Sequence, residues 1–422
     1  MSRRLLLIGL ATGCGLVARA GDWPQWRGPN RDAHVSGFTA PATWPKELVK
    51  KWSVPVGDGV GTPALVGDKL FVFTRQGGDE VTRCMAAATG QEVWQDKYPA
   101  APATGPAGSF PGPRASPVVA QGKVITYGVQ GALSCLDAAT GKALWRKAEP
   151  MLSPPMFFTS SSPIVVGGLC VVQLGGDRGG AVAALDLATG EERWRWAGDG
   201  TKYASPALLT VDGTTMVVAV TANNLVGIAA DSGKLLWQVS LAGAGAPKGG
   251  GGKGAKGGKG GGRAYNAGSP VIDGQTVITS GAGRGVTAYR VGKTGDKWAA
   301  TEVWANKELA AEFDTPVVHD GRVFGLSDRN ALFCLDSKTG KAAWTADIRG
   351  GNRPGYGSIV DAGSVLLALT PAGRLTVFEP TDKEFKQVAE YPVGTETYAY
   401  PVVDGRRVYV KDKSALTLWL IE

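Results

Sequence analysis

A short pattern recurs along this chain and constrains its fold more than any other feature. A small residue stands two positions before Asp-x-x-Thr-Gly, and a Trp stands four positions after the glycine. Asp and Thr oxygens bond the local backbone and Gly accepts positive φ, so this motif makes a tight turn between two strands. The pattern therefore predicts an all-β protein; its copies lie at residues 135–145, 184–194 and 334–344, with looser copies at 84–94 and 227–237.

Each copy belongs to a longer unit of four short apolar segments. The units open at a proline preceded by Ser or Thr, or at an equivalent position, and successive openings are 42 to 64 residues apart. A period in this range, with four short strands in each unit, is the signature of a β-propeller. Eight openings predict a single eight-bladed propeller with four antiparallel strands in each blade; they are Pro63, Pro117, Pro163, Pro206, Pro270, Pro316, Ser358 and Pro401.

The last unit ends at Glu422, which leaves no room for a fourth strand. Residues 49–56, which contain Trp52, have the character of that missing strand. Closing the ring with an N-terminal strand removes exposed sheet edges. We therefore predict one ring over residues 49–422. In the fifth unit we expect Trp298 or Trp304 to take the role of the repeat Trp, and in the seventh we expect Tyr391 to replace it.

Composition supports a folded β protein with a nearly neutral body. The hydrophobic share of 43% excludes general disorder, and the charged share of 19% argues against long surface helices. Of the net charge of +8, residues 1–20 carry +3 and residues 243–262 carry +4, which leaves +1 for the rest. A nucleic-acid partner is not supported. The Gly/Lys tract at 243–262 is predicted to be a flexible exposed insertion.

Residues 1–20 have the features of a secretory signal peptide: a basic start, an apolar stretch and the small-x-small pattern at residues 18–20. We expect an exported protein of the periplasm or cell envelope, with no transmembrane span. The general and twin-arginine routes both stay open, and a lipid anchor at Cys14 is the alternative to simple cleavage. Residues 21–48 are expected to form an arm whose tryptophans, Trp23 and Trp26, dock on the propeller.

The cysteines and histidines do not form a recognisable reactive site. Cys84, Cys135 and Cys334 occupy the small position of the repeat, and Cys170 lies in an apolar strand, so all four are expected to be buried thiols. The chain has two histidines, His34 in the arm and His319 in a turn, and we expect His319 to be solvated. Neither a His-based metal cluster nor a Ser-His-Asp triad is predicted, and no metal site is expected.

With these features together, the chain resembles the PQQ-like β-propeller repeat family, which includes BamB-like proteins and quinoprotein alcohol dehydrogenases. Residues 23–32 are similar to the start of many secreted BamB-like members. The quinoprotein dehydrogenases hold PQQ between a Trp and a disulfide of adjacent cysteines, and bind calcium through Glu, Asn and Asp. This chain has no adjacent cysteines. We therefore favour a non-catalytic, cofactor-free envelope scaffold that binds a protein, peptide or glycan; the alternative is a PQQ-dependent oxidoreductase with calcium.

Propeller geometry predicts where binding would occur. Loops that join a fourth strand to the next first strand share one face with loops that join second and third strands. We expect a monomer that binds its partner on that face, with these candidate residues: Arg114, Lys202, Tyr203, Asn266, Arg284, Asp314, Asp328, Arg329, Arg353, Tyr356, Arg374 and Tyr398. The same loops contain Asn223, Tyr265, Asn352 and Asp412.

Overall fold

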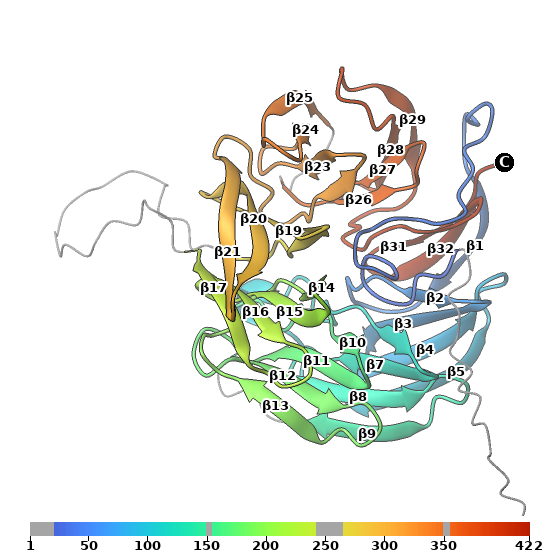
Figure 1. The fold of residues 1–422 in the computed structure, drawn as a ribbon. Helices are drawn as coiled ribbons and strands as arrows, with labels where there is room; N and C mark the ends of the chain where they lie inside the picture. Colours follow the sequence, from blue (N-terminus) through green and yellow to red (C-terminus); the bar gives the residue numbers. More distant parts are fainter. Residues whose placement is uncertain (1–20, 149–153, 242–264, 349–354) are drawn as a thin grey trace, which may run out of the picture.

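The computed structural model describes residues 21–148, 154–241, 265–348 and 355–422, and these form eight four-stranded antiparallel sheets set in a ring (Figure 1). The predicted eight-bladed, all-β architecture is confirmed. Each blade runs outward from its first strand, which begins at the predicted opening. The helical content of the described residues is one short 3-10 turn, η1 (Gly105–Ala107).

The first four blades follow one another along the chain, in the order first to fourth strand. Their strands are β2 (Ala64–Val66), β3 (Lys69–Gln76), β4 (Asp79–Ala86) and β5 (Glu92–Pro99); β6 (Val118–Ala120), β7 (Lys123–Tyr127), β8 (Ala132–Asp137) and β9 (Ala143–Ala148); β10 (Ile164–Val166), β11 (Leu169–Leu174), β12 (Ala181–Asp186) and β13 (Glu192–Trp196); and β14 (Ala207–Val211), β15 (Thr214–Val220), β16 (Asn224–Ala229) and β17 (Leu235–Ser240).

The last four blades continue in the same way. Their strands are β18 (Val271–Asp273), β19 (Thr276–Gly281), β20 (Gly285–Thr294) and β21 (Lys297–Asn306); β22 (Val317–His319), β23 (Arg322–Leu326), β24 (Ala331–Asp336) and β25 (Ala342–Asp347); β26 (Ser358–Asp361), β27 (Leu366–Leu369), β28 (Arg374–Phe378) and β29 (Gln387–Pro392); and β30 (Val402–Asp404), β31 (Arg407–Lys411), β32 (Ala415–Leu420) and β1 (Val49–Pro55).

The ring is closed by the N-terminal strand, as predicted. Strand β1 pairs antiparallel with β32, from Val49 opposite Leu420 to Pro55 opposite Ala415, and the two lie side by side in Figure 1. The side chain of Trp52 packs on Gly90 of the first blade. The last blade is therefore built from both ends of the propeller sequence.

The Asp-x-x-Thr-Gly motif makes the turn between third and fourth strands. In the second blade, Asp137 Oδ1 accepts hydrogen bonds from the Thr140 N–H at 2.8 Å and the Thr140 hydroxyl at 2.7 Å. Gly141 has a φ of +76° and donates its N–H to the Asp137 carbonyl at 2.8 Å. The bonds from Thr140 hold the pKa of Asp137 below its usual value. The turn is thus stabilised locally.

The same turn also fixes the neighbouring blade. The Trp194 ring of the third blade packs on Gly233 of the fourth, and its Nε1–H donates to the Ala230 carbonyl there at 3.0 Å. Trp145 makes the equivalent contacts with Gly190 and with the Leu187 carbonyl, at 3.1 Å. A Cβ on Gly190 would lie 2.7 Å from the Trp145 ring. Glycine is therefore required for both its backbone conformation and its size.

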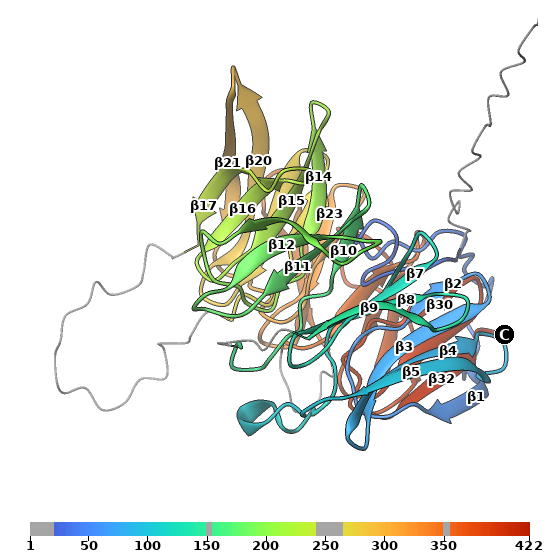
Figure 2. The same cartoon turned by 90° about the horizontal axis from the view of Figure 1, so that it is seen from below.

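Two blades depart from the repeat. In the fifth, β20 and β21 form a long hairpin that projects beyond its neighbours (Figure 2), and Trp304 takes the repeat role, donating to the Ser337 carbonyl at 2.7 Å. In the seventh, the residue in register with the repeat Trp is Ala389; Tyr391 lies two positions further along. The Tyr391 hydroxyl donates to the Pro45 carbonyl, 2.8 Å away. In the eighth blade no turn joins the third strand, β32, to the fourth, β1, and the arm contacts the seventh blade in place of such a turn.

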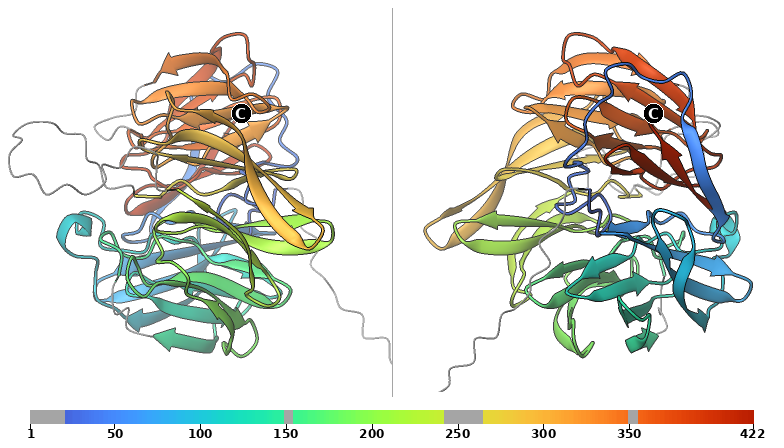
Figure 3. Two further views of the ribbon diagram at one scale, coloured as in Figure 1. Left: turned by 60° about the vertical axis from the view of Figure 1, so that its left-hand side comes forward. Right: turned by 90° about the vertical axis from the view of Figure 1, so that its right-hand side faces the viewer.

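The arm runs from the start of the described region onto the propeller (Figure 3, right), and it brings His34 to a carboxylate that His319 of the sixth blade also contacts. His34 Nδ1 lies 3.1 Å and His319 Nδ1 lies 2.9 Å from Asp361 Oδ2. Asp361 itself is buried. The expectation that His319 is solvated was wrong, because its turn faces the arm and Asp361 of the adjacent blade.

The four cysteines of the described region are unpaired and buried, as expected from their places in the repeat. Burial raises the pKa of Cys84 to about 11 and that of Cys170 to about 12. The predicted signal peptide, the Gly/Lys tract and Arg353 lie outside the described residues. Within these residues, no helix has the length and apolar character needed to cross a membrane.

The packing of Trp on the turn glycine can be tested with a matched pair of variants. Gly190 and Gly167 both have positive φ, but nothing lies within 4 Å of a Cβ on Gly167. In both variants the free energy of unfolding falls because Ala is unfavourable in the left-handed backbone conformation. Only Gly190→Ala also places a methyl group against a neighbouring side chain. We expect Gly190→Ala to lower the unfolding free energy by about 1–3 kcal/mol more than Gly167→Ala, as measured by urea denaturation. Equal losses would contradict the packing role.

Ring closure predicts a second result. Deleting residues 21–56 removes β1 and leaves the edge of β32 unpaired, so the protein should aggregate or melt at a much lower temperature. Deleting only residues 21–45 keeps β1 and serves as the control for loss of the arm. Light scattering and thermal denaturation of both variants make the measurement. If the larger deletion were monodisperse with an unchanged midpoint, closure by β1 would be unimportant.

Candidate functional site

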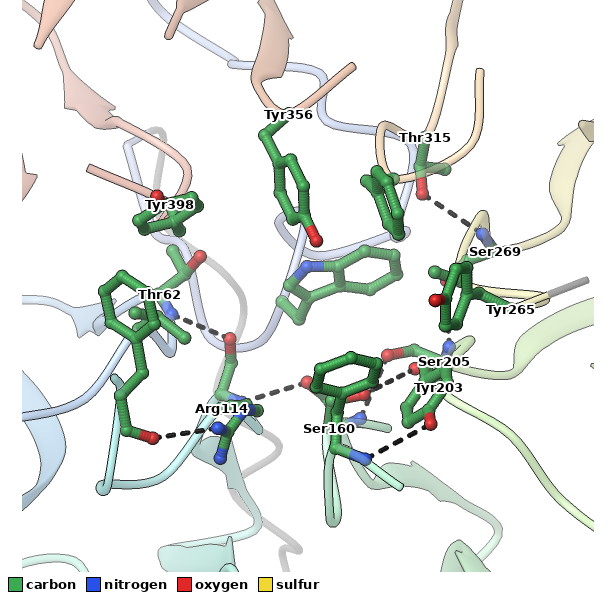
Figure 4. Close-up of a pocket in the computed structure, with 18 of the residues that line it drawn as sticks. Thr62, Arg114, Ser160, Tyr203, Ser205, Tyr265, Ser269, Thr315, Tyr356 and Tyr398 are labelled. Carbon is green, nitrogen blue, oxygen red and sulfur yellow. Dashed lines mark hydrogen bonds between the residues drawn. The ribbon is translucent and has the colours of Figure 1, made fainter. Parts of the chain in front are cut away.

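A ring of hydroxyl groups lies at the inner end of the blades. The residue before the opening proline of one blade donates its backbone N–H to the hydroxyl of the equivalent residue in the next. Ser116 donates to Ser162, and Ser162 to Ser205, each at 2.9 Å. Six such bonds, of 2.8–3.1 Å, run in order through Tyr400, Thr62, Ser116, Ser162, Ser205, Ser269 and Thr315. Figure 4 shows part of this ring.

The N-terminal arm fills the gap where the seventh blade contributes no group to the ring of hydroxyls. The seventh blade has Gly357 in the register position, so it offers no hydroxyl. Arg27, which is fully buried, donates instead to the carbonyls of Thr315 and Pro316 and to the Tyr400 hydroxyl, the last at 2.9 Å. Its guanidinium therefore links the sixth blade to the eighth.

A second arginine of the arm reaches the opposite blades. Arg31 donates to the carbonyls of Ser162, Pro163 and Pro206, in the third and fourth blades. Burial lowers the pKa of Arg31 to about 9. Trp26 stands between the two guanidiniums, which lie 5.6 and 6.0 Å from its ring centre. The arm thus closes the inner space at one end, and Trp26 faces the cavity that remains.

That cavity is a cup of about 330 Å³, which we call the aromatic cup. Its wall takes one aromatic side chain from each of seven loops that join successive blades. Neighbouring rings contact one another: Phe313 stacks on Tyr356 with centroids 4.1 Å apart, and Tyr356 meets Tyr398 edge-on at 5.6 Å. The seven are Phe110, Phe157, Tyr203, Tyr265, Phe313, Tyr356 and Tyr398, and Figure 4 shows the labelled tyrosines around the opening.

Arg114 supplies the single charge among the described residues that line the cup. Its guanidinium donates to three carbonyls of its own loop, those of Phe110 at 2.8 Å, Ala107 at 3.0 Å and Gly112 at 3.3 Å. No carboxylate of the described residues forms an ion pair with it. Burial lowers the pKa of Arg114 to about 10, so the side chain stays cationic at neutral pH. The cup therefore holds a fixed, uncompensated positive charge.

The structure separates the candidate residues into two groups. Arg114, Tyr203, Tyr356 and Tyr398 line the cup, as does Tyr265. The others that it describes do not line it. Lys202 pairs with Asp177 at 2.5 Å, Arg374 pairs with Glu390 at 3.3 Å, and the Arg329 backbone bonds the Ser327 hydroxyl.

Four more candidates lie in or behind the loops. Asn266 is buried and donates to the carbonyls of Thr221 and Ala222 at 2.9 Å. Arg284 donates to the Ser280 carbonyl, and the Asp328 N–H to the Ala310 carbonyl. Asp314 is fully buried behind the cup and accepts from the Leu326 N–H at 2.8 Å. Assigning a residue to a loop therefore gave the end of the propeller on which it lies, and did not give its distance from the channel.

Sequence reasoning missed Phe110, Phe157 and Phe313 in the wall and Trp26 in the floor. A signal for the wall exists, because an aromatic residue precedes seven of the eight blade openings by two to seven positions. A Ser or Thr precedes six of the seven opening prolines and marked the repeat, but the role of its hydroxyl became visible only when the blades were placed side by side.

Comparisons with known proteins agree with this architecture. Residues 77–346, more than half of the chain, match the family described as "Outer membrane protein assembly factor BamB". The chain belongs to this family. Within it, BamB of Burkholderia pseudomallei (strain K96243) is 28% identical over 170 residues, which cover 39% of this chain and 40% of that protein.

Similarity also extends to quinoproteins. A quinohemoprotein alcohol dehydrogenase of Comamonas testosteroni is 27% identical over 187 residues, 43% of this chain and 26% of that enzyme. The chain thus matches less than half the length of either curated relative. Among solved structures, BamB of Moraxella catarrhalis has a TM-score of 0.63 at 15% identity, covering 89% of this chain and 98% of that one. A europium-containing methanol dehydrogenase has a TM-score of 0.70 at 12% identity, covering 95% and 98%. These two likenesses show the fold.

The residues of the cup do not fit a calcium-held quinone. The chain has no pair of adjacent cysteines to lie against the quinone. The described lining contains no carboxylate or amide side chain to bind calcium. Across the described ranges, no three His, Cys, Asp or Glu residues are grouped so that they could hold a metal ion. The donor set of the cup therefore gives no support for a reaction step through PQQ.

Asp314 predicts a pH dependence of stability. Burial raises its pKa from 3.8 to about 6, so the native carboxyl holds its proton more strongly than the unfolded one. Its contribution to stability is present below pH 3.8 and is lost as the pH rises through about 6. Relative to Asp314→Asn, the wild type should lose about 2 kcal/mol between pH 4 and pH 7. Urea denaturation of both proteins at both pH values tests this, and parallel pH profiles would contradict it.

Proposed function

We propose that this protein is an exported, non-catalytic scaffold of the cell envelope that binds a partner molecule through the aromatic cup. The observation that carries the proposal is the cup itself: seven aromatic side chains and one cation converge on one cavity from separate blades. A cavity with an apolar wall and a few placed polar groups is the usual form of a binding site. Membership of the BamB family supports the scaffold role.

The location and domain organisation are part of this proposal. An N-terminal signal over residues 1–20, an arm at 21–48 and a propeller at 49–422 are consistent with an envelope protein that works as a monomer. The proposed partners are an envelope protein, a peptide or a glycan. The cup holds only one cation in its described lining, which suits a ligand of low charge and disfavours a nucleic acid.

The alternative, a PQQ-dependent oxidoreductase, is favoured only by the similarity to quinohemoprotein alcohol dehydrogenase. It can be tested directly with the purified protein, PQQ and calcium. We expect no bound quinone spectrum and no dye-linked alcohol oxidation, because the donors for calcium are missing from the described lining and the chain has no adjacent cysteines. Stoichiometric quinone binding with turnover would replace our proposal by the alternative.

The scaffold role is tested by placing a photo-reactive amino acid at position 398, in the cup, and at position 338, in a turn on the opposite face. Envelope extract is irradiated with each protein, and cross-linked products are identified by mass spectrometry. We expect a specific product from position 398 only. Tyr356→Ala should weaken that product at least about tenfold, since an aromatic anchor at a binding site is worth about 2 kcal/mol or more.

The matched control is Arg322→Ala with Lys338→Ala on the opposite face, where Arg322 forms a surface ion pair with Asp382. This double variant should keep the cross-link and its thermal midpoint. A partner that cross-links from position 338 and not from position 398, and that Tyr356→Ala still captures from position 338, would show that the cup is the wrong face.

A further inference from the structure

The hydroxyl ring leaves a set of hydrogen-bond donors unused. The hydroxyl oxygens of five ring residues accept an N–H from the preceding blade and line the cup, and none donates its own proton to an atom of the described residues. A hydroxyl has one proton and two acceptor positions, so each of the five can still donate to a ligand. The five are Thr62, Ser116, Ser162, Ser205 and Ser269.

Arg114 adds charged donors on the wall of the same cavity (Figure 4). Three loop carbonyls hold the guanidinium in place, and no acid of the described residues neutralises it. These three bonds use three of the five guanidinium N–H groups, including both on Nη2, so the positive charge and two N–H groups, one on Nε and one on Nη1, remain for a ligand carboxylate. A single cation matches a single carboxylate, whereas a polyphosphate would require several cations.

The aromatic side chains of the wall limit further the chemical class of ligand that the cup can bind. Tyrosines present both a ring face and a hydroxyl, and the cup has Tyr203, Tyr265, Tyr356 and Tyr398 around its opening. Such side chains can pack on the C–H face of a sugar ring while their hydroxyls bond its polar substituents. The described lining has no carboxylate to pair with a cationic group, so a ligand that carries one negative charge is favoured over a basic peptide.

From these observations we infer that the aromatic cup binds a sugar acid, a pyranose that carries one carboxylate, either free or at the end of an acidic polysaccharide. The carboxylate of the sugar lies at Arg114, and the hydroxyl oxygens of the sugar accept hydrogen bonds from the five hydroxyl groups named above. The sugar ring packs on the tyrosines. The cavity of about 330 Å³ has room for one or two sugar residues. This inference rests on the proposed function of the cup as the binding site.

The first test uses the unmodified mature protein. Titration calorimetry compares D-glucuronate with D-glucuronamide, which has the same ring without the charge. We expect glucuronate to bind at least about tenfold more tightly, with an affinity that falls as salt is raised. Equal affinities, or no binding by either, would overturn the inference. The second probe is an oligogalacturonate of four residues, compared with D-galacturonate. Tighter binding of the oligomer identifies a polysaccharide end, and equal binding identifies the free sugar acid.

The second test assigns the carboxylate to its residue. Arg114→Met should weaken glucuronate about 10- to 100-fold and leave the weak binding of glucuronamide nearly unchanged. Arg322→Met, on the opposite face, is the control and should change neither. Circular dichroism and the thermal midpoint show whether Arg114→Met folds. Arg114→Lys keeps the charge but loses the guanidinium bonds that fix it on the loop, so its affinity should be intermediate. A variant that folds and retains full glucuronate affinity would contradict the role of Arg114.

The outcomes separate this inference from the proposed function. If a partner cross-links at position 398 but no sugar acid binds, the inference fails and the scaffold role stands. If neither a partner nor a sugar acid engages the cup, both fail.

Discussion

Hydrogen bonds between neighbouring blades at the inner end of the propeller determine where the loops that form the aromatic cup lie. A backbone N–H of one blade meets the hydroxyl of the next in six successive junctions. Each bond holds two opening prolines at a fixed separation, and the loop that precedes each proline is thereby brought to the channel. The aromatic wall and Arg114 belong to these loops, so the cup is a direct consequence of the ring.

The interruption of this ring explains the arm. Gly357 provides no hydroxyl, and the buried guanidinium of Arg27 bonds the carbonyls and the tyrosine that surround the gap. Buried carbonyls without partners are costly, so the arm stabilises the inner end while closing it. Because Trp26 is carried by the same segment, the floor of the cup and the repair of the ring come from one stretch of chain.

Far from the channel, a different contact holds neighbouring blades together. A Trp of one blade packs on the turn glycine of the next and donates to a carbonyl beside it, as Trp145 does with Gly190 and Leu187. These contacts involve the turns opposite the cup. The scaffold is therefore held at both ends of the blades, and the loops of the cup face are left free to differ. This division fits a family in which one fold supports different functions.

The sequence by itself determined the number of blades, the strand that closes the ring, the hairpin turns and the buried cysteines, because each depends on spacing or on local backbone chemistry. The Asp-x-x-Thr-Gly turn, for example, is stabilised within its own few residues. Tertiary structure alone decided which polar loop residues line the cup: Arg114 lines it, whereas Arg374 pairs with Glu390 and Asp314 is buried. It also decided that His319 meets Asp361, and that Tyr391 bonds the arm instead of replacing a Trp. These outcomes depend on the distance of each side chain from the channel and on contacts between blades far apart in sequence, which no local pattern encodes.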